Sequence, residues 1–363
     1  MSRARTLADQ FNSDGDLALT PVASVNAGQI GGRRNLIING AMEVAQRGTS
    51  FSGQTNNYPV DRFNYNQSSS ATMNLEQSSD APDGFLNSAK LTVNAVDTSI
   101  ASTDYSQLVH KIEGLNIAHL NWGSSSAKTV TLSFWVKCSV TGDWPVRLVN
   151  SDGSKSYAFY FTVNTADTWE YKTKTIEGPT SGTFLTTNGN GLELGVGFAT
   201  GSTYAGATAN QWSTVTSYAS SNLANNTGWI GTTGNTFLIT GVQLEVGSAA
   251  TDFEHRSYGE ELALCQRYYE FLYTMDGCHA GTFGGWSHEN RQCVPHYKVR
   301  KRAVPTITFY DYSTNISGTP WVTRDFQTVA TQDCFKFNSR FFATTEYIYI
   351  DRPNGSIIAD AEL

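Results

Sequence analysis

The chain has 363 residues, of which only 16% are charged and 12% are aromatic. Its formal net charge of −7 argues against a nucleic-acid partner, because phosphate binding requires a basic surface. The sequence contains no apolar run of the length that a membrane span needs, and its first residues lack the apolar core of a signal peptide. We therefore expect a protein that is made in a cytoplasm and does not enter a membrane.

Residues 1–34 form a polar, Gly-containing segment with little apolar periodicity. Such a segment has too little apolar surface to offset the entropy of folding alone. It carries four apolar side chains that could dock on another surface: Leu7, Phe11, Leu17 and Leu19. We predict an extended arm that folds against a partner. The alternative is a plain disordered tail.

Residues 35–256 contain strand after strand. Apolar side chains alternate with polar or small ones in four runs, at 129–138, 157–163, 192–198 and 238–246. Gly- and Asn-containing turn signals separate the runs. One-sided alternation indicates antiparallel sheets with one buried face each, and two such sheets stack as a sandwich. The fold class predicted from the sequence is therefore all-β.

Residues 257–273 follow a different period and predict one short amphipathic helix. Its stripe is formed by Leu262, Cys265, Tyr269 and Leu272, and Ser257 can cap its first turn. A helix of this length is marginal alone, so it must pack on a sheet or on copies of itself.

Residues 274–363 return to strand patterns, at 303–310 and 346–351, and predict a small C-terminal β-domain. A basic cluster precedes the first of these runs, on a strand-like segment: Lys298, Arg300, Lys301 and Arg302. A solvated strand face explains it most simply. The alternative is contact with an anionic glycan or lipopolysaccharide, in which Lys298, Arg300 and Arg302 would touch the receptor.

The five cysteines are an odd number and none lies in a CxxC pair, so we expect small buried hydrophobes rather than a disulfide framework. Cys138 falls on an inward strand phase and Cys265 on the predicted helix. The run 278–296 gathers further Cys and His residues that could bind zinc: Cys278, His279, His288, Cys293 and His296. Their spacing is not that of a zinc finger, and a loop with incidental Cys and His is the simpler interpretation.

Several of the eight tryptophans lie in polar, loop-like contexts where they could stack on sugar rings. We single out Trp122, Trp144, Trp212 and Trp229, with Asp143 as a neighbouring polar group, as candidate glycan contacts. The alternative is that these indoles pack under loops or at subunit contacts, where tryptophan is also enriched.

Signs of catalysis are absent from the sequence. GxSxG, HExxH and Walker patterns do not occur, and nothing in the sequence pairs two carboxylates as glycan hydrolysis requires. We predict that the protein is not an enzyme.

Five segments together resemble one known module: NLIINGAMEVAQRGTSF at 35–51, YPVDRF at 58–63, VTLSFWVKCSVTG at 130–142, TWEYKTKTIEG at 168–178 and ITGVQLEVGSAATDFEHRSYGEELALCQRYYE at 239–270. The module is the carbohydrate-binding-like jelly-roll of phage tail-fibre and related structural proteins, marine ones especially. The run RTLADQFNSDGDLALTPVASVN at 5–26 is similar to arms at the start of fibre or adaptor proteins in phages of marine cyanobacteria. The C-terminal part, with RKRAVPTITFYD at 300–311 and the ending IIADAEL, is similar to the small β-domain that often closes such fibres.

The resemblance implies a homotrimeric virion protein that mediates attachment to the host surface and has no catalytic residues. The arm at 1–34 would bind a phage tail or adaptor protein, the jelly-roll would span 35–256, and 274–363 would face a host glycan or lipopolysaccharide. The stripe of the 257–273 helix would then form a trimer seam. A purely architectural virion protein, such as a tail adaptor, collar or capsid-decorating fibre, is the rival interpretation.

The same resemblance implies a structural calcium ion near the first and last strands of the jelly-roll. Glu43 and either Asp252 or Glu254 would supply its oxygen ligands. The alternative is that these are surface carboxylates at strand ends.

Overall fold

The computed structural model describes residues 24–25, 28–29, 33–214, 217–219, 228–272, 290–293, 296–310, 327–340 and 356–363. Within these residues the fold is all-β, and the expectation of a jelly-roll β-sandwich is confirmed. Most of the predicted arm lies outside the described residues, apart from residues 33–34 and the short paired strands β1 (Ser24–Val25) and β2 (Gly28–Gln29). None of the described helices is long and apolar enough to cross a membrane.

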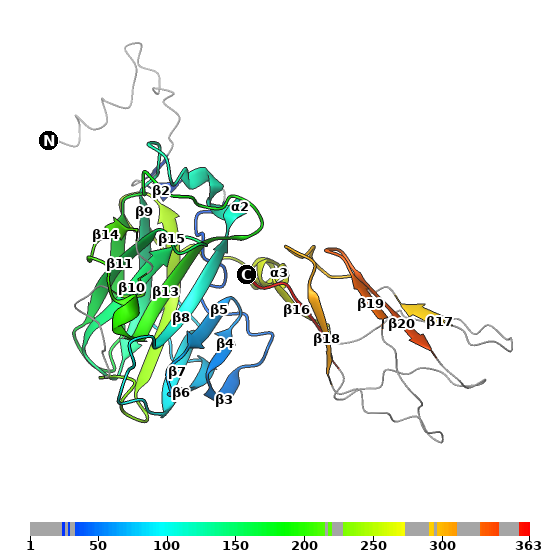
Figure 1. Cartoon of the computed structure of the whole chain (residues 1–363), viewed down its shortest axis with the longest axis horizontal. Coiled ribbons are helices and arrows are strands. Elements are labelled where there is room, and N and C mark those ends of the chain that lie inside the picture. Colours follow the sequence, from blue (N-terminus) through cyan, green and yellow to red (C-terminus); the bar gives the residue numbers. More distant parts are fainter. Residues whose placement is uncertain are drawn as a thin grey trace, which may run out of the picture.

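Two antiparallel sheets form the sandwich (Figure 1). The seven-stranded sheet has the order β14-β11-β10-β13-β8-β5-β4, and the six-stranded sheet has the order β12-β9-β15-β7-β6-β3. The strands of the first sheet are β4 (Asn56–Val60), β5 (Phe63–Gln67), β8 (Tyr105–Glu113), β10 (Gly142–Val149), β11 (Ser156–Val163), β13 (Asn190–Thr200) and β14 (Gln211–Ser213). Those of the second are β3 (Ser50–Gln54), β6 (Thr72–Ser78), β7 (Ser88–Ala95), β9 (Val130–Cys138), β12 (Glu170–Ile176) and β15 (Thr236–Val246).

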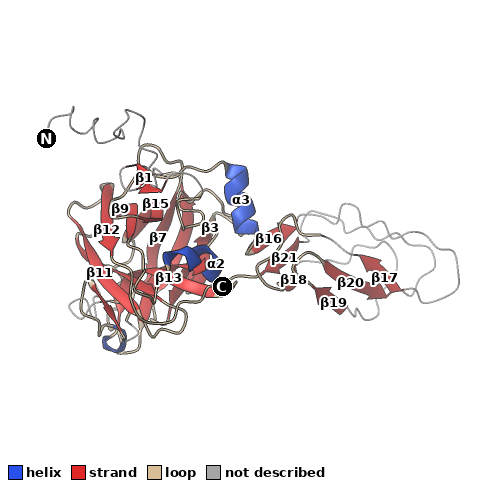
Figure 2. Ribbon diagram, turned by 90° about the horizontal axis from the view of Figure 1, so that it is seen from above, coloured by secondary structure: helices blue, strands red, loops and turns tan. Residues whose placement is uncertain are grey.

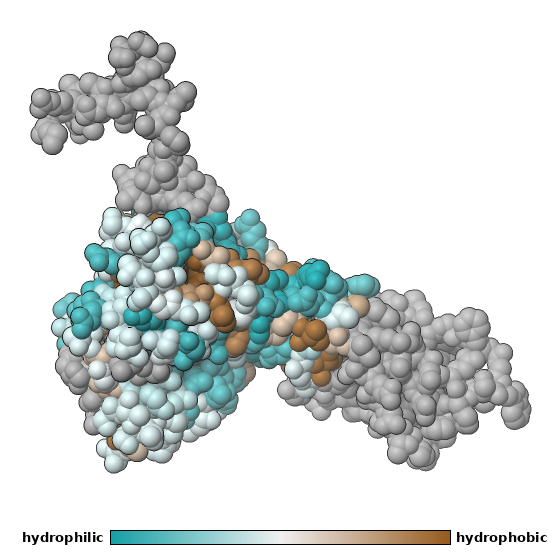
Figure 3. Space-filling model, turned by 45° about the horizontal axis from the view of Figure 1, so that its top comes forward, coloured by the Kyte–Doolittle hydropathy of each residue, from teal (hydrophilic) through white to brown (hydrophobic). Residues whose placement is uncertain are grey.

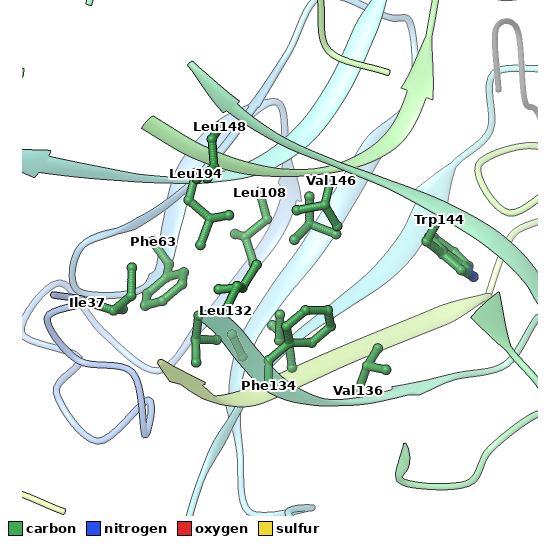
Figure 4. Close-up of a cluster of buried hydrophobic side chains, with 14 of the residues drawn as sticks. Ile37, Phe63, Leu108, Leu132, Phe134, Val136, Trp144, Val146, Leu148 and Leu194 are labelled. Carbon is green, nitrogen blue, oxygen red and sulfur yellow. The ribbon is translucent and has the colours of Figure 1, made fainter. Parts of the chain in front are cut away.

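The core lies between the two sheets, where the alternating apolar side chains meet. Leu132, Phe134 and Val136 point inward from β9, because every second side chain of a strand faces the same side. Leu108 of β8 and Leu194 of β13 point toward them from the other sheet (Figure 4). Cys138 and Cys265 are buried free thiols, as predicted, and burial raises the pKa of both.

The helix predicted over 257–273 is wrong in its second half. Helix α3 (Tyr258–Gln266) begins after Ser257, whose hydroxyl accepts from the Glu260 N–H in a capping box. The chain then turns and forms a strand, β16 (Tyr269–Leu272). Pairing of β16 with the last strand, β21 (Ser356–Asp360), favours the extended conformation over the continued helix. Two helical turns, α2 (Gly114–Ile117) and η1 (Ala118–Leu120), follow β8, and η2 (Ser202–Tyr204) follows β13.

The described C-terminal residues form two small sheets beside the sandwich (Figure 2). One has the order β16-β21-β18, with β18 at Thr306–Tyr310, and agrees with the strand predicted at 303–310. The other has the order β17-β20-β19, formed by Asn290–Cys293, Phe335–Arg340 and Gln327–Ala330. Because β16 belongs to the first small sheet, the C-terminal domain begins before the predicted boundary at 274. The strand predicted at 346–351 lies outside the described residues.

Candidate functional site: a groove along β8

A groove of about 180 Å³ lies on the outer face of the seven-stranded sheet. It is lined by Tyr58, Arg62, Asn64, Asn66, Tyr105, Gln107, Val109, Lys111, Glu193, Tyr218, Glu362 and Leu363. Strand β8 forms its floor, since Tyr105, Gln107, Val109 and Lys111 share the outward side of that strand. The alternate side chains of β8 face the core. The groove is thus the polar side of a strand whose other side builds the sandwich.

Strand β5 forms one wall with two amides. Asn64 and Asn66 are two residues apart and both line the groove, which places their side chains roughly 7 Å apart along the strand. Neither amide makes a hydrogen bond to another described residue, whereas Arg62, Gln107 and Lys111 of the same groove do. Each amide offers a planar donor and acceptor. This wall can therefore bond to hydroxyl groups of a ligand.

A buried arginine supports the opposite wall. Arg147 of β10 is 1% exposed, donates from Nε to Oε1 of Gln107 at 3.0 Å and pairs with Glu193. Its guanidinium lies 4.2 Å from the centre of the Tyr218 ring. Gly195 leaves room for this side chain, because a Cβ there would lie 2.9 Å from Nε of Arg147. Arg147 thus positions the Gln107 amide, the Glu193 carboxylate and the Tyr218 ring along one side of the groove.

Two tyrosines, Tyr105 and Tyr218, line the end of the groove at the start of β8, and Tyr204 packs against both. The rings of Tyr204 and Tyr218 stack with centres 4.6 Å apart, and Tyr105 meets both edge-on, at 5.9 and 5.2 Å. Burial raises the pKa of Tyr218, so its hydroxyl stays protonated at neutral pH. The cluster thus places three half-buried aromatic rings at one end of the groove.

The other end of the groove meets the C-terminal segment. Arg62 pairs with Glu362 and also donates from Nη2 to the Lys111 carbonyl at 2.5 Å. Lys111 donates from Nζ to the Leu363 carbonyl at 2.7 Å. Burial lowers the pKa of Arg62, but the Glu362 carboxylate outweighs it and the pKa is raised, so this arginine stays charged.

Figure 3 shows the hydropathy of one face of the molecule. Apolar surface gathers where the sandwich meets the C-terminal sheet, and most of the surface around it is more hydrophilic.

The tryptophans singled out from the sequence are elsewhere, and the prediction that they form an exposed platform is wrong. Trp144 and Trp229 do meet Asp143 around a second cavity, of about 120 Å³. Their side chains are only 5% and 3% exposed, because the indoles pack on each other and on Phe198 at the end of the sandwich.

The other two candidate tryptophans also serve packing. The rings of Trp122 and Trp212 lie 5.3 Å apart. Trp122 is buried and donates from Nε1 to the Lys128 carbonyl, and Trp212 is half-buried and donates to the Glu177 carbonyl. Large aromatic residues in loops fill the space where a sandwich ends, which the residue types alone do not separate from ligand contacts.

The candidate calcium ligands do not converge. The Glu254 carboxylate already accepts the backbone N–H groups of Arg34 and Asn35, at 3.0 and 2.6 Å, and a guanidinium N–H of Arg256 at 2.9 Å. Within the described residues no group of three or more His, Cys, Asp or Glu side chains is placed to hold a metal, so Glu43, Asp252 and Glu254 do not form such a group. The calcium ion stays a prediction that these residues do not support.

The stripe assigned to a trimer seam does not exist as one surface. Cys265 is fully buried, with Leu262 beside it, in a cluster with Ile38, Val44 and Tyr268 of the same chain. Tyr269 and Leu272 lie on β16 instead, Tyr269 buried and Leu272 packed on the small C-terminal core. The seam prediction is therefore wrong for this stripe, because the chain itself covers its central residues.

The basic cluster separates into surface and anchoring residues, and its segment is not a strand. Lys298 and Arg300 are exposed, and Arg300 lies 3.7 Å from Asp333. Lys301 is fully buried. Arg302 donates to the carbonyls of Ala361, Glu362 and Asn188, so it holds the C-terminal segment and is not a free receptor contact as predicted.

The candidate zinc residues contribute nothing further. Cys278, His279 and His288 lie outside the described residues, and the side chain of Cys293 is not described. His296 is exposed and forms an isolated β-bridge with Cys334.

The sequence did contain a signal for the groove, in YSQLVHK at 105–111. Its outward positions combine an aromatic residue, an amide and a cation. Such a pattern is equally typical of an ordinary solvated strand face, so only the neighbouring strands and the C-terminal segment mark it as a groove.

Comparison with known proteins gives likeness in structure only. No family model matches the sequence, and no curated protein matches it. The enzymatically active domain of tailspike protein 4 from bacteriophage CBA120 is 12% identical with a TM-score of 0.33, over 58% of this chain and 21% of that chain. A family 11 carbohydrate-binding module from Clostridium thermocellum is 10% identical with a TM-score of 0.29, over 52% of this chain and 91% of that chain.

A third solved structure is a putative sugar binding protein from Bacteroides thetaiotaomicron, 12% identical with a TM-score of 0.31, over 59% of this chain and 100% of that chain. The groove itself therefore carries the functional interpretation.

Proposed function

We propose that this chain is a phage tail-fibre or spike protein that attaches to a host-surface glycan through the groove along β8. The observation that carries the proposal is that one depression combines two amides, which bond to no other described side chain or backbone group, with aromatic rings: Asn64 and Asn66 on one wall, Tyr105 and Tyr218 at one end. A sugar ring presents apolar C–H faces and hydroxyl edges. Aromatic faces and planar hydrogen-bonding groups are the matching surfaces.

The groove suits binding better than cleavage. Hydrolysis of a glycosidic bond needs two carboxyl groups, one of them protonated, on either side of the bond. The two carboxylates that line this groove, Glu193 and Glu362, are each paired with an arginine, Arg147 and Arg62. Both carboxylates are therefore engaged by guanidinium groups of the chain itself. We therefore propose a non-enzymatic protein, for which incubation with bound glycans should release no reducing sugar.

Three further parts of the proposal rest on the sequence resemblance: assembly as a homotrimer, anchoring to the virion through residues 1–34, and location in the tail or fibre. Several weak groove contacts on one particle would add up through avidity. Sizing of the purified chain with light scattering tests the trimer. Binding of a peptide for residues 1–34 to purified tails tests the anchor.

The central experiment is a glycan array probed with the full chain and two matched variants. Tyr105→Ala removes an aromatic ring that lines the groove. Tyr171→Ala removes a 44% exposed tyrosine from β12, in the other sheet, where it packs 5.3 Å from Trp135. We expect Tyr105→Ala to weaken binding by about tenfold or more and Tyr171→Ala to leave it unchanged. Equal effects of both changes, or no bound glycan at all, would overturn the proposal.

The burial of Trp122, Trp144 and Trp229 favours the architectural rival, because it removes the aromatic platform first expected for sugar binding. A virion protein that binds only other virion proteins would bind tails tightly and would not adsorb to host cells. The two functions are separated by measuring both interactions with the same purified chain.

A further inference from the structure

The groove has a closed end. It follows β8 from Tyr105 to Lys111 and stops before Glu113, the next outward residue of the strand. Glu113 is 1% exposed because Arg267 and Tyr268 cover it, donating to its carboxylate at 2.6 and 2.8 Å. The segment that follows α3 therefore blocks the path along β8.

The C-terminal segment completes this wall. Glu362 and Leu363 line the groove beside Lys111. Four contacts fix their position: the pair of Arg62 with Glu362, the bond from Lys111 to the Leu363 carbonyl, the bond from Arg302 to the Glu362 carbonyl at 2.7 Å, and the bond from the Ala361 N–H to the Tyr268 carbonyl at 2.7 Å. Opening the wall would leave the buried guanidinium of Arg62 unpaired, which is costly.

The groove is also small. Its volume of about 180 Å³ is below the roughly 300–1,000 Å³ typical of pockets that enclose a drug-sized ligand. It accommodates a short piece of a chain, and the covered Glu113 blocks the continuation of such a chain along β8 on that side.

We infer that the groove binds the terminal saccharide units of a glycan, with the chain end against Glu362 and Leu363 and the rest of the chain leaving past Tyr105. The inference rests on the proposed function and adds that the ligand must present a free chain end. An internal segment of a polysaccharide would have to pass through the wall.

The test uses the full chain and an array that carries each oligosaccharide twice, attached once through its reducing end and once through its non-reducing end. We expect every bound oligosaccharide to bind in one orientation only, with a signal difference of about tenfold or more. Equal binding in both orientations would overturn the chain-end inference and leave glycan binding intact. An array without any bound glycan would overturn the proposed function, and the inference with it.

Two variants probe the wall itself. Leu363→Gly shortens the wall, and Lys111→Met removes the bond to the Leu363 carbonyl while the pair of Arg62 with Glu362 remains. Both should lower the orientation preference, and Tyr171→Ala should retain it. Thermal unfolding identifies a variant that fails to fold. The orientation preference of the other variant then tests the assignment of the wall. A preference unchanged in a folded wall variant contradicts the assignment of the wall.

Discussion

The ammonium nitrogen of Lys301 lies 2.6 Å from a carboxylate oxygen of Glu270, and neither side chain is exposed to solvent. Lys301 also donates to the Gln266 carbonyl, and Glu270 accepts the backbone N–H of Lys298. Burial lowers the pKa of Lys301, against the effect of its partner. The pair ties β16 to the segment 296–302 and so holds the C-terminal sheet together.

Replacing Lys301 alone should be strongly destabilising. Lys301→Met leaves the buried Glu270 carboxylate without its cation, which costs on the order of 3–5 kcal/mol in the free energy of unfolding. Adding Glu270→Gln removes the uncompensated charge and should recover most of the loss. Denaturant unfolding measures both. Arg300→Met, at the exposed pair with Asp333, is the matched control and should change stability by less than about 1 kcal/mol.

Asp61 should make stability depend on pH. Burial raises its pKa to about 6, although Arg47 and the hydrogen bonds from Gln46 lower it. Between the ordinary value of 3.8 and about 6, the folded state holds a proton that the unfolded state has lost. Asp61 therefore contributes fully to the free energy of unfolding at pH values below its ordinary pKa. This contribution is lost as the pH rises toward 6, which lowers the free energy of unfolding by about 3 kcal/mol.

The measurement is the free energy of unfolding as a function of pH for the wild type and Asp61→Asn. The difference between the two curves isolates Asp61 from other groups, such as Glu113. Burial raises the pKa of Glu113, but the Arg267 and Tyr268 hydrogen bonds outweigh it and the pKa is lowered, so Glu113 acts in the opposite sense. Parallel curves would show that Asp61 does not titrate in this window.

Trp229 should matter for stability and not for ligand binding. Its side chain is 3% exposed, and its ring centre lies 4.9 Å from that of Phe198 in the sandwich core. Trp229→Ala should lower the free energy of unfolding by about 3–5 kcal/mol. The affinity of the folded molecules for any array-positive glycan should stay unchanged, in contrast to Tyr105→Ala. A loss of affinity in folded Trp229→Ala would show that this residue takes part in ligand binding.

Ser257 should stabilise the start of α3. Its hydroxyl accepts from the Glu260 N–H, and the Glu260 carboxylate accepts from the Ser257 N–H at 3.0 Å. Ser257→Ala removes the first bond and should cost about 1 kcal/mol, whereas Ser257→Thr keeps a capping oxygen and should cost less. Thermal unfolding compares the two. Identical losses would mean that the cap contributes nothing.

Some of the fold could be predicted because it depends on local periodicity. Alternation in β9 and β15 assigns one face of each strand to a core, whatever the strand pairs with. The Ser257 cap is equally local, since its partner is three residues away. These patterns were sufficient to predict an antiparallel sandwich, the start of a helix after it, and a further β-region.

The extent of the helix and the binding surface could not be predicted in the same way. Tyr269 and Leu272 continue a helical spacing, and only β21, about 90 residues later, turns them into a strand. Trp144 and Trp229 have loop-like surroundings in the sequence, but their burial depends on how two sheets close at their ends.

The groove depends on tertiary structure most of all. Asn64, Gln107 and Glu362 come from three distant segments, and none of them is unusual in its own sequence context. By itself the sequence determined that this protein is a β-sandwich, because side-chain alternation is a property of each strand. Only the tertiary structure decided where a ligand could bind, because that place exists where β5, β8 and the returning C-terminal segment meet.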